Sequence, residues 1–289
     1  MSAITLIAGP TASGKSALAL ARARESGAVI VNADSQQLYA DLRVLSARPS
    51  ALEESLARHR LYGTADGAEA WSVGRWQRAA MEEIETARSE GRPVIIVGGT
   101  GLYFRALTLG LAEVPAVPDA LRDALTREFD VRGEDAMRAE LRIADPAAEA
   151  RIMRGDRQRL VRAAAVARHT GRSLSEWQNQ TTAPLPENSY ETLLLLPERE
   201  ALYARCDLRA EQMMQQGALE EVERLLAREL SAEVPVMKAV GVRELAAYLK
   251  GEITKAEALD RLKTATRQYA KRQMTWFRNQ TPHWPRASP

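Results

Sequence analysis

Eight residues near the start of the chain have the types and spacing of a phosphate-binding loop. They follow an apolar run, precede a stretch with helical spacing, and read Gly9, Pro10, Thr11, Ala12, Ser13, Gly14, Lys15 and Ser16. Glycines let backbone N–H groups curl around a phosphate, and the N-terminus of the next helix adds the positive end of its dipole. We expect Lys15 to neutralise phosphate oxygens and the Ser16 hydroxyl to hold Mg²⁺. A glycine turn without function is the alternative, which the strand–loop–helix context disfavours.

Two further apolar runs end in polar or glycine-rich residues. The run 28–33 leads into Asp34, whereas the run 93–97 leads into Gly98-Gly99-Thr100-Gly101, which contains no acid. Nucleotide hydrolases and kinases usually carry a metal-organising carboxylate at the end of a strand of this kind. The run 93–97 is instead followed only by backbone N–H groups and the Thr100 hydroxyl. Asp34 could act as a general base facing the loop, or its carboxylate could hold the turn that follows the strand. The spacing leaves both interpretations open.

The elements that would position these residues alternate between strands and helices. Strands are expected at 4–8, 28–33, 93–97 and 191–196, and helices at 16–25, 72–90, 198–215, 219–229, 243–250 and 255–278. This order predicts an α/β fold with a parallel sheet flanked by helices. The carboxyl ends of parallel strands converge on a ligand crevice, which places Asp34 one strand away from the glycine-rich loop.

The segment 113–188 has no strand signal and is bordered by prolines on both sides. Helical patterns occur at 119–129, 134–144, 147–153 and 157–170. We therefore expect a small helical domain inserted into a catalytic core made of 1–112 and 189–289. The insertion could cover the crevice like the lid of a small-molecule kinase.

The bulk composition is that of a soluble globular protein. The chain has 289 residues, 45% of them apolar and 27% charged, with a net charge of +2. No apolar run approaches the ~18–20 residues that span a bilayer, and cleavage of a signal peptide would destroy the loop. The single cysteine, Cys206, suits a reducing compartment. We expect a cytoplasmic protein, and nothing in the sequence demands more than a monomer or an obligate protein partner.

Basic residues gather in two stretches. Residues 151–172 contain seven arginines and one acid, and residues 261–278 contain six basic residues and no acid, interleaved with Tyr269, Trp276 and Phe277. Basic helices with aromatic side chains suit phosphate contact and base stacking. A solvated helix face is the more common explanation of either stretch taken alone.

Taken in order, five segments resemble the tRNA dimethylallyltransferases of bacterial type, also called tRNA isopentenyltransferases. Besides the loop 9–16, they are Asn32-Ala33-Asp34-Ser35-Gln36-Gln37-Leu38-Tyr39, Gly98-Gly99-Thr100-Gly101-Leu102-Tyr103-Phe104, Asp156-Arg157-Gln158-Arg159-Leu160-Val161-Arg162 and Thr266-Arg267-Gln268-Tyr269-Ala270-Lys271-Arg272-Gln273. Gln36, Arg48 and Val242 depart from the family pattern, in which arginine, lysine and tyrosine are usual at these positions.

The resemblance implies transfer of a dimethylallyl group from dimethylallyl diphosphate to N6 of adenosine 37, beside the tRNA anticodon, giving N6-isopentenyladenosine and diphosphate. It implies that Asp34 is the general base, that Thr100 and Lys15 take part in catalysis, and that the target base is extruded from its stack. The anticodon stem-loop would be contacted by Asp34, Ser35, Gln36, Gln37, Thr100, Arg122, Gln158, Arg159, Leu160, Val161 and Arg162. Mg²⁺ at Ser16 would be the cofactor, and the loop 9–16 would bind the diphosphate.

Two other functions are compatible with parts of the pattern. A nucleoside or small-molecule kinase fits the chain length, the loop and a lid-like insertion, but not the acid-free end of the run 93–97. A nucleotide-switched RNA-binding module is disfavoured because no Asn-Lys-x-Asp pattern for reading guanine occurs.

Overall fold

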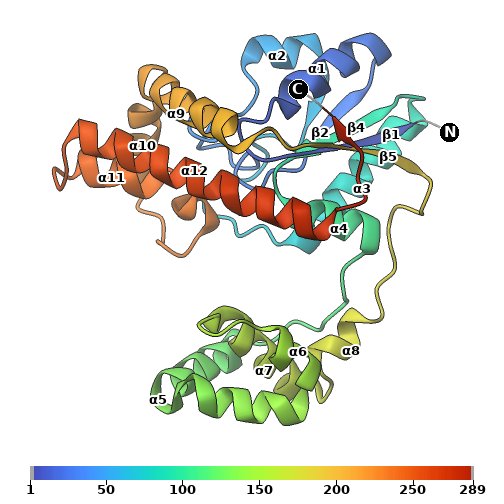
Figure 1. Ribbon diagram of the computed structural model, residues 1–289, viewed down its shortest axis with the longest axis vertical. Coiled ribbons are helices and arrows are strands. Elements are labelled where there is room, and N and C mark those ends of the chain that lie inside the picture. The colour runs from blue at the N-terminus through green and yellow to red at the C-terminus, as the bar shows by residue number, and fades with distance from the viewer. Residues whose placement is uncertain (1–2, 288–289) are drawn as a thin grey trace. The chain divides into compact units, whose positions relative to one another are not determined.

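The computed structural model describes residues 3–287, which form two compact units (Figure 1). Unit 1 runs up to Thr108 and resumes at Leu185, and unit 2 spans Leu109–Pro184. The sequence predicts these boundaries at 112/113 and 188/189. Within unit 1 the backbone N–H of Leu185 donates to the carbonyl of Leu107 at 3.1 Å, so the chain leaves and re-enters this unit at neighbouring points.

Unit 1 is built on a parallel sheet with the strand order β3-β2-β4-β1-β5-β6. The strands are β1 Ile4–Ala8, β2 Val29–Asn32, β3 His59–Arg60, β4 Val94–Gly98, β5 Tyr190–Leu195 and β6 Arg286–Ala287. The predicted α/β fold with a parallel sheet is confirmed. The expected placement of Asp34 one strand from the loop is wrong, because β4 lies between β1 and β2; chain order does not fix the spatial order of parallel strands.

Alternating strand residues bury both faces of this sheet, as a parallel sheet covered by helices requires. Leu6, Val31 and Ile96 belong to a core shared with α3 (Val73–Ser89) and α4 (Gly101–Leu109), whereas Ile7 and Ile30 pack with α1 (Lys15–Ser26). Figure 1 shows α1 and the short α2 (Ala51–Leu56) on one side of the sheet and α3 and α4 on the other.

The C-terminal half of unit 1 is helical. It contains α9 Arg199–Gln215, α10 Ala218–Leu226, a 3₁₀ turn at Pro235–Lys238, α11 Val242–Leu249 and α12 Lys255–Gln280. Leu202, Cys206 and Met213 of α9 are buried, and α12 packs against both α9 and α11. None of the helices in the described range 3–287 is both long and apolar enough to cross a bilayer.

Unit 2 has a hydrophobic core of its own. Its helices are α5 Asp119–Ala144, α6 Pro146–Arg151, α7 Arg157–Thr170 and α8 Leu174–Gln178. Leu125 and Leu141 of α5 pack with Leu160 and Val161 of α7. Gly133 has φ 81° and ψ 171°, which interrupts α5 between the two segments that the sequence predicted as separate helices. This left-handed φ favours glycine at the break.

Candidate active site

The glycine-rich loop connects β1 to α1 in the geometry expected of an anion-binding turn. Gly14 caps α1 with φ 91°, Ala12 has φ 61°, and no side chain caps the helix. The first N–H groups of a helix have no intrahelical partner, so this turn presents free donors together with the positive end of the helix dipole. The Ser13 hydroxyl is buried without a partner in the described structure.

A cleft of about 480 Å³ opens in front of these N–H groups. The side chains that line it include Lys15, Ser16, Asp34, Arg43, Arg48, Tyr62, Arg209 and Met213, together with the loop backbone from Thr11 to Gly14. A smaller apolar recess adjoins the cleft and shares Asp34, Arg209 and Met213 with it; Leu45, Val240 and Leu262 contribute the apolar wall. The cleft therefore joins a cationic, amide-lined end to a recess that contains a carboxylate.

Two cations lie desolvated beside the loop. Lys15 is only 6% exposed, its Nζ donates to the Pro10 carbonyl at 3.2 Å, and burial lowers its pKa to about 8 although Asp34 partly offsets this shift. Arg209 of α9 donates to Thr11 Oγ1 at 3.2 Å, and burial lowers its pKa as well. Charges held away from water attract an anion more strongly than charges on the surface. The pair is suited to a polyanionic phosphate.

Asp34 follows β2 and is 6% exposed. Its Oδ1 accepts the backbone N–H of Gln36 at 3.1 Å, which is the turn-forming role that the sequence left open, and its Oδ2 receives no hydrogen bond from the described residues. Asn32, which is fully buried, accepts the N–H of Asp34 at 2.8 Å and donates to the Leu61 carbonyl at 2.9 Å. One oxygen thus fixes the carboxylate while the other stays free to accept a proton.

The end of β4 is shaped to bring Asp34 and the loop together across it. A Cβ on Gly98 would lie 2.0 Å from the Ala33 carbonyl oxygen, and a Cβ on Gly99 would lie 3.2 Å from Asp34 Oδ2. Side chains at these two positions would separate β2 from β4, so the glycines allow the close approach. The sequence shows that the end of β4 carries no acid. Only the structure shows that its two glycines make room for Asp34, which follows β2.

Thr100 lies directly beside the segment that follows Asp34. Its Oγ1 accepts the N–H of Ser35 at 2.9 Å and donates to Ser35 Oγ at 3.2 Å. The hydroxyl of Tyr269, from α12, contacts both Gln36 and Thr100, and burial raises the pKa of Tyr269 so that it stays protonated. Ser35, Gln36 and Thr100 are therefore brought together next to Asp34; Gln36 lines the recess, whereas Ser35 and Thr100 line neither the recess nor the cleft.

The side-chain amides of Gln36 and Gln37 already have partners within the protein. Gln36 Oε1 accepts the N–H of Val240 at 3.1 Å, and Gln37 Nε2 donates to the carbonyls of Ser46 and Ala47 at 3.0 and 2.9 Å. Gln37 consequently anchors the segment 42–48, whose residues form one wall of the cleft.

The six unit 2 residues that the resemblance assigns to tRNA differ in accessibility. Arg122, Gln158, Arg159 and Arg162 are exposed. Leu160 and Val161 are buried in the core of unit 2, so their side chains pack rather than face a ligand. Partial desolvation and the nearby Arg122 guanidinium lower the pKa of Arg162.

The basic stretch 151–172 is less cationic than its sequence indicates, because α5 supplies acids from elsewhere in the chain. Arg154 pairs with Asp135 at 2.9 Å, Arg157 pairs with Asp130 at 2.6 Å, and Arg168 pairs with Glu128 at 2.7 Å. On α12, by contrast, five cations form no ion pair with any residue of the described range: Lys255, Arg261, Lys271, Arg272 and Arg278.

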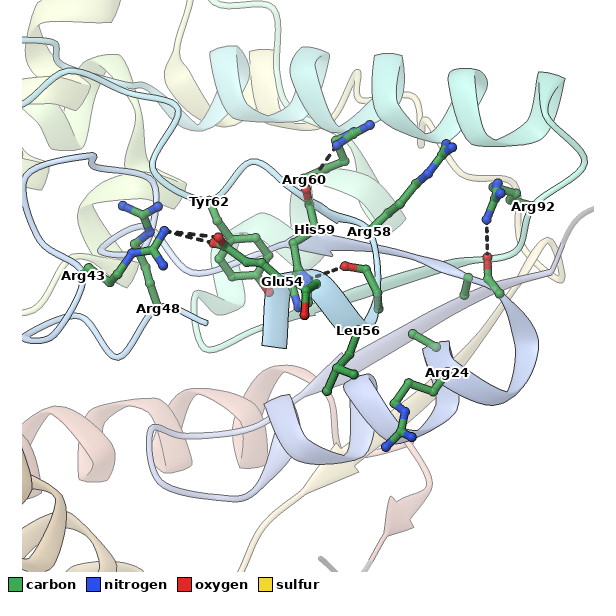
Figure 2. Close-up of a pocket in the computed structure, with 15 residues that line it drawn as sticks. Arg24, Arg43, Arg48, Glu54, Leu56, Arg58, His59, Arg60, Tyr62 and Arg92 are labelled. Atoms are coloured by element: carbon green, nitrogen blue, oxygen red, sulfur yellow. Dashed lines mark hydrogen bonds and ion pairs between the residues drawn. The ribbon is translucent and has the colours of Figure 1, made fainter. Parts of the chain in front are cut away.

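A second basic pocket, of about 630 Å³, adjoins the cleft and shares Arg43, Arg48, His59 and Tyr62 with it (Figure 2). Its remaining cations are Arg24, Arg58, Arg60 and Arg92. Most of its arginines are neutralised: Arg43 pairs with Glu54 at 3.2 Å, Arg58 with Glu90 at 2.6 Å, and Arg60 with Glu83 at 3.3 Å. We therefore place the candidate site at the glycine-rich loop.

Among residues 3–287 no group of three or more histidines, cysteines or acids is arranged to hold a metal ion. The cleft does contain the exposed Ser16, whose hydroxyl has no hydrogen-bond partner in this range. Mg²⁺ usually keeps several waters and is bound through one or two protein oxygens plus substrate phosphates. The residues present fit an ion that a diphosphate brings with it, and not a metal site made by the protein alone.

The fold and the cleft together define an α/β protein whose glycine-rich loop, between β1 and α1, has the geometry of an anion-binding turn. A family model described as IPP transferase matches residues 37–280. A "tRNA dimethylallyltransferase" of Phenylobacterium zucineum is 56% identical over 283 residues, covering 98% of this chain and 92% of the relative, and one of a Caulobacter species is 53% identical with the same coverage. The chain belongs to the IPP transferase family.

Solved structures agree with this assignment. The full-length tRNA isopentenylpyrophosphate transferase of Bacillus halodurans is 30% identical, with a TM-score of 0.68 and coverage of 99% of this chain and 90% of that one. A eukaryotic dimethylallyltransferase described as acting on tRNA is 26% identical, with a TM-score of 0.82 and coverage of 96% and 70%. The coverage extends the similarity to the N-terminal loop, which lies outside the span of the family model.

Sequence reasoning missed two polar side chains of the site. Arg209 lies in a helix without any local motif, so only the fold reveals that it reaches the loop. Gln273 belongs to a segment that carries the family resemblance, but its spacing gave no role; its side-chain amide contacts Thr11 of the loop and Gly99.

Proposed function

We propose that this protein transfers the dimethylallyl group of dimethylallyl diphosphate to N6 of adenosine 37 of tRNA. One observation carries the proposal: a single cleft joins a cationic phosphate loop to a buried carboxylate with one free oxygen, and the intervening strand end carries no acid that would organise a nucleotide-bound metal. The family membership and the names of the relatives support the same reaction.

The diphosphate occupies the loop end of the cleft. Backbone N–H groups of the first turn of α1, together with Lys15 and Arg209, stabilise the negative charge that grows on the leaving group as the allylic C–O bond breaks. Mg²⁺ carried by the diphosphate and held by Ser16 would supply further neutralisation of that charge. Stabilising the leaving group lowers the barrier directly, because the allylic carbon can bear positive charge.

The adenine lies at the carboxylate end. Its N6 attacks C1 of the prenyl group, the C1–O bond breaks, and the electron pair leaves with the diphosphate. The free Oδ2 of Asp34 accepts the N6 proton. Thr100, held beside Ser35, contacts the reacting phosphate or the amine. The apolar residues of the adjoining recess, including Leu45 and Leu262, suit the methyl groups of the donor.

The exposed cations of both units are available to the RNA backbone. In unit 2 the proposed contacts are Arg122, Arg159 and Arg162, beside Gln158. Arg122 and Arg159 pair with Asp119 and Asp156 at 2.9 and 3.2 Å, so an RNA phosphate would compete with these carboxylates. In unit 1 the proposed contacts are the unpaired cations of α12. Phosphate contacts of this kind position an RNA, whereas contacts to the extruded base select it. We also propose that the protein acts as a cytoplasmic monomer.

Purified protein incubated with radiolabelled dimethylallyl diphosphate, Mg²⁺ and unmodified tRNA should give labelled RNA. Nuclease digestion should place the label at the adenosine 3′ to the anticodon, and tRNA with guanosine at that position is the matched control. Phosphorylation of a small alcohol by ATP, with no label in RNA, would instead indicate a kinase.

A further inference from the structure

We propose that Gln273 of α12 is a positioning residue whose side-chain amide holds the phosphate loop and the end of β4 at a fixed separation. Oε1 accepts the backbone N–H of Thr11 at 2.8 Å, and Nε2 donates to the Gly99 carbonyl at 2.8 Å. The side chain is 6% exposed; its bond to Gly99 is buried and its bond to Thr11 is partly buried. The proposal rests on the function proposed above.

The chemistry of the two partners dictates a primary amide at position 273. The Thr11 N–H can only donate and the Gly99 carbonyl can only accept, so the bridge needs an acceptor and a donor on one planar group. Methionine offers neither function, and an ionised glutamate offers only acceptors. Without the bridge, the partly buried Thr11 N–H and the buried Gly99 carbonyl would lose their partners.

The close approach of α12 to this site is built into the backbone. A Cβ on Gly99 would lie 2.2 Å from Gln273 Nε2, and a Cβ on Gly101 would lie 2.1 Å from the Trp276 ring. One helical turn before Gln273, the Tyr269 hydroxyl contacts Gln36 and Thr100. A single helix therefore contacts the segments that follow β1, β2 and β4.

These segments carry the groups that act on the two substrates. Thr11 belongs to the loop that grips the diphosphate, and Gly99 stands between Asp34 Oδ2 and Thr100. Because a misplacement of about 1 Å between reacting groups can cost about 100-fold in rate, the bridge sets the transfer rate rather than the binding of either substrate.

Gln273→Met and Gln273→Glu test this role, with the exposed Gln280→Met at the end of the same helix as the matched control. We expect both Gln273 variants to lower the single-turnover rate constant of prenyl transfer at least 30-fold. The Kd for tRNA should change less than threefold, and the Kd for inorganic diphosphate less than tenfold. Gln280→Met should match the wild type in all three measurements.

If Gln273 served only in packing, Gln273→Met should react faster than Gln273→Glu, because methionine fills a similar volume without burying a charge. A Gln273→Met enzyme with the wild-type single-turnover rate would overturn the proposal, as would equal weakening of the rate and of tRNA affinity. Should both variants fail to fold, Gln273→Asn keeps the amide but is one methylene too short to reach both partners, and it must give the same loss of rate with tRNA binding retained. Absence of transfer by the wild type would instead reject the proposed function.

Discussion

The two carboxylate oxygens of Asp34 have different surroundings, and this separates a structural role from a chemical one. Oδ1 receives the N–H of Gln36, and Oδ2 has no partner within residues 3–287. In Asp34→Asn the amide oxygen can still receive the Gln36 N–H, but the other position can no longer accept a proton. We expect the single-turnover rate to fall about 10²–10⁴-fold with the Kd for tRNA within threefold of the wild type.

Asp34→Ala is the companion variant, since it removes the turn as well as the base. If Asp34→Asn reacted at nearly the wild-type rate while Asp34→Ala did not, the turn and not proton transfer would explain the requirement for this residue. The sequence alone could not separate these roles, because they depend on which oxygen faces the cleft.

Lys15 gives the donor site a pH dependence. Its folded-state pKa is lowered from 10.5 to about 8 by burial, so the free enzyme loses this charge as the pH rises through about 8. An anion binds the charged form better; the affinity for inorganic diphosphate should therefore fall between pH 7 and pH 9.5, by up to about tenfold for each pH unit above 8.

Lys15→Arg is the reference for this titration, because arginine keeps its charge throughout the range. The ratio of wild-type to Lys15→Arg association constants, measured by calorimetry, also cancels the titration of diphosphate itself. A ratio that does not change with pH would show that Lys15 stays protonated in the free enzyme.

At the scale of elements, one buried carboxylate anchors the segment that walls the cleft. Glu221 of α10 accepts the backbone N–H groups of Arg43, Val44 and Leu45 at 2.6, 3.0 and 2.8 Å. In Glu221→Gln an amide donor replaces one acceptor oxygen, so at least one N–H loses its partner. We expect a loss of about 1–3 kcal/mol in the free energy of unfolding, measured by urea titration.

Glu220→Gln, on the exposed side of the same helix, should stay within about 0.5 kcal/mol of the wild type. Since Val44 and Ala47 line the cleft, Glu221→Gln should also raise the KM for the donor. Equal stability of the two variants would mean that the segment 42–48 is held by its other contacts alone.

The long elements could be predicted because their apolar spacing extends over several turns, as in α7, where the predicted range 157–170 is the observed one. The two-residue strands β3 and β6 and the short α2 and α8 were missed, because they are too short to show a period. The site was predictable where a motif is local, as at residues 9–16, but Arg209 and Gln273 reach it only through the packing of α9 and α12.

At the scale of the whole molecule, unit 2 can be removed because the two ends that its removal would leave in unit 1 lie close together. The Leu185 N–H already donates to the Leu107 carbonyl, and unit 2 has its own core. Replacing Leu109–Pro184 by a short Gly-Ser linker should leave the Kd for inorganic diphosphate within threefold. The affinity for tRNA should fall at least 50-fold, because the exposed arginines of unit 2 are lost.

Filter binding at fixed ionic strength measures the second quantity, and calorimetry on the same preparation measures the first. Retention of full tRNA affinity by the shortened protein would place the RNA contacts in unit 1 alone. Loss of diphosphate binding would show that the loop depends on unit 2.

The aromatic residues are distributed so that each unit can be observed optically. Trp177 is the only tryptophan between Leu109 and Pro184, whereas Trp71, Trp76, Trp276 and Trp284 lie in unit 1. Its indole N–H donates to Thr170 Oγ1 at 3.3 Å, and the Arg172 guanidinium lies 4.5 Å above its ring. Subtracting the emission of a Trp177→Phe protein from that of the wild type leaves the fluorescence of Trp177, which reports on the inserted unit. Stopped-flow mixing with tRNA could then time the response of this unit independently of the prenyl-transfer chemistry.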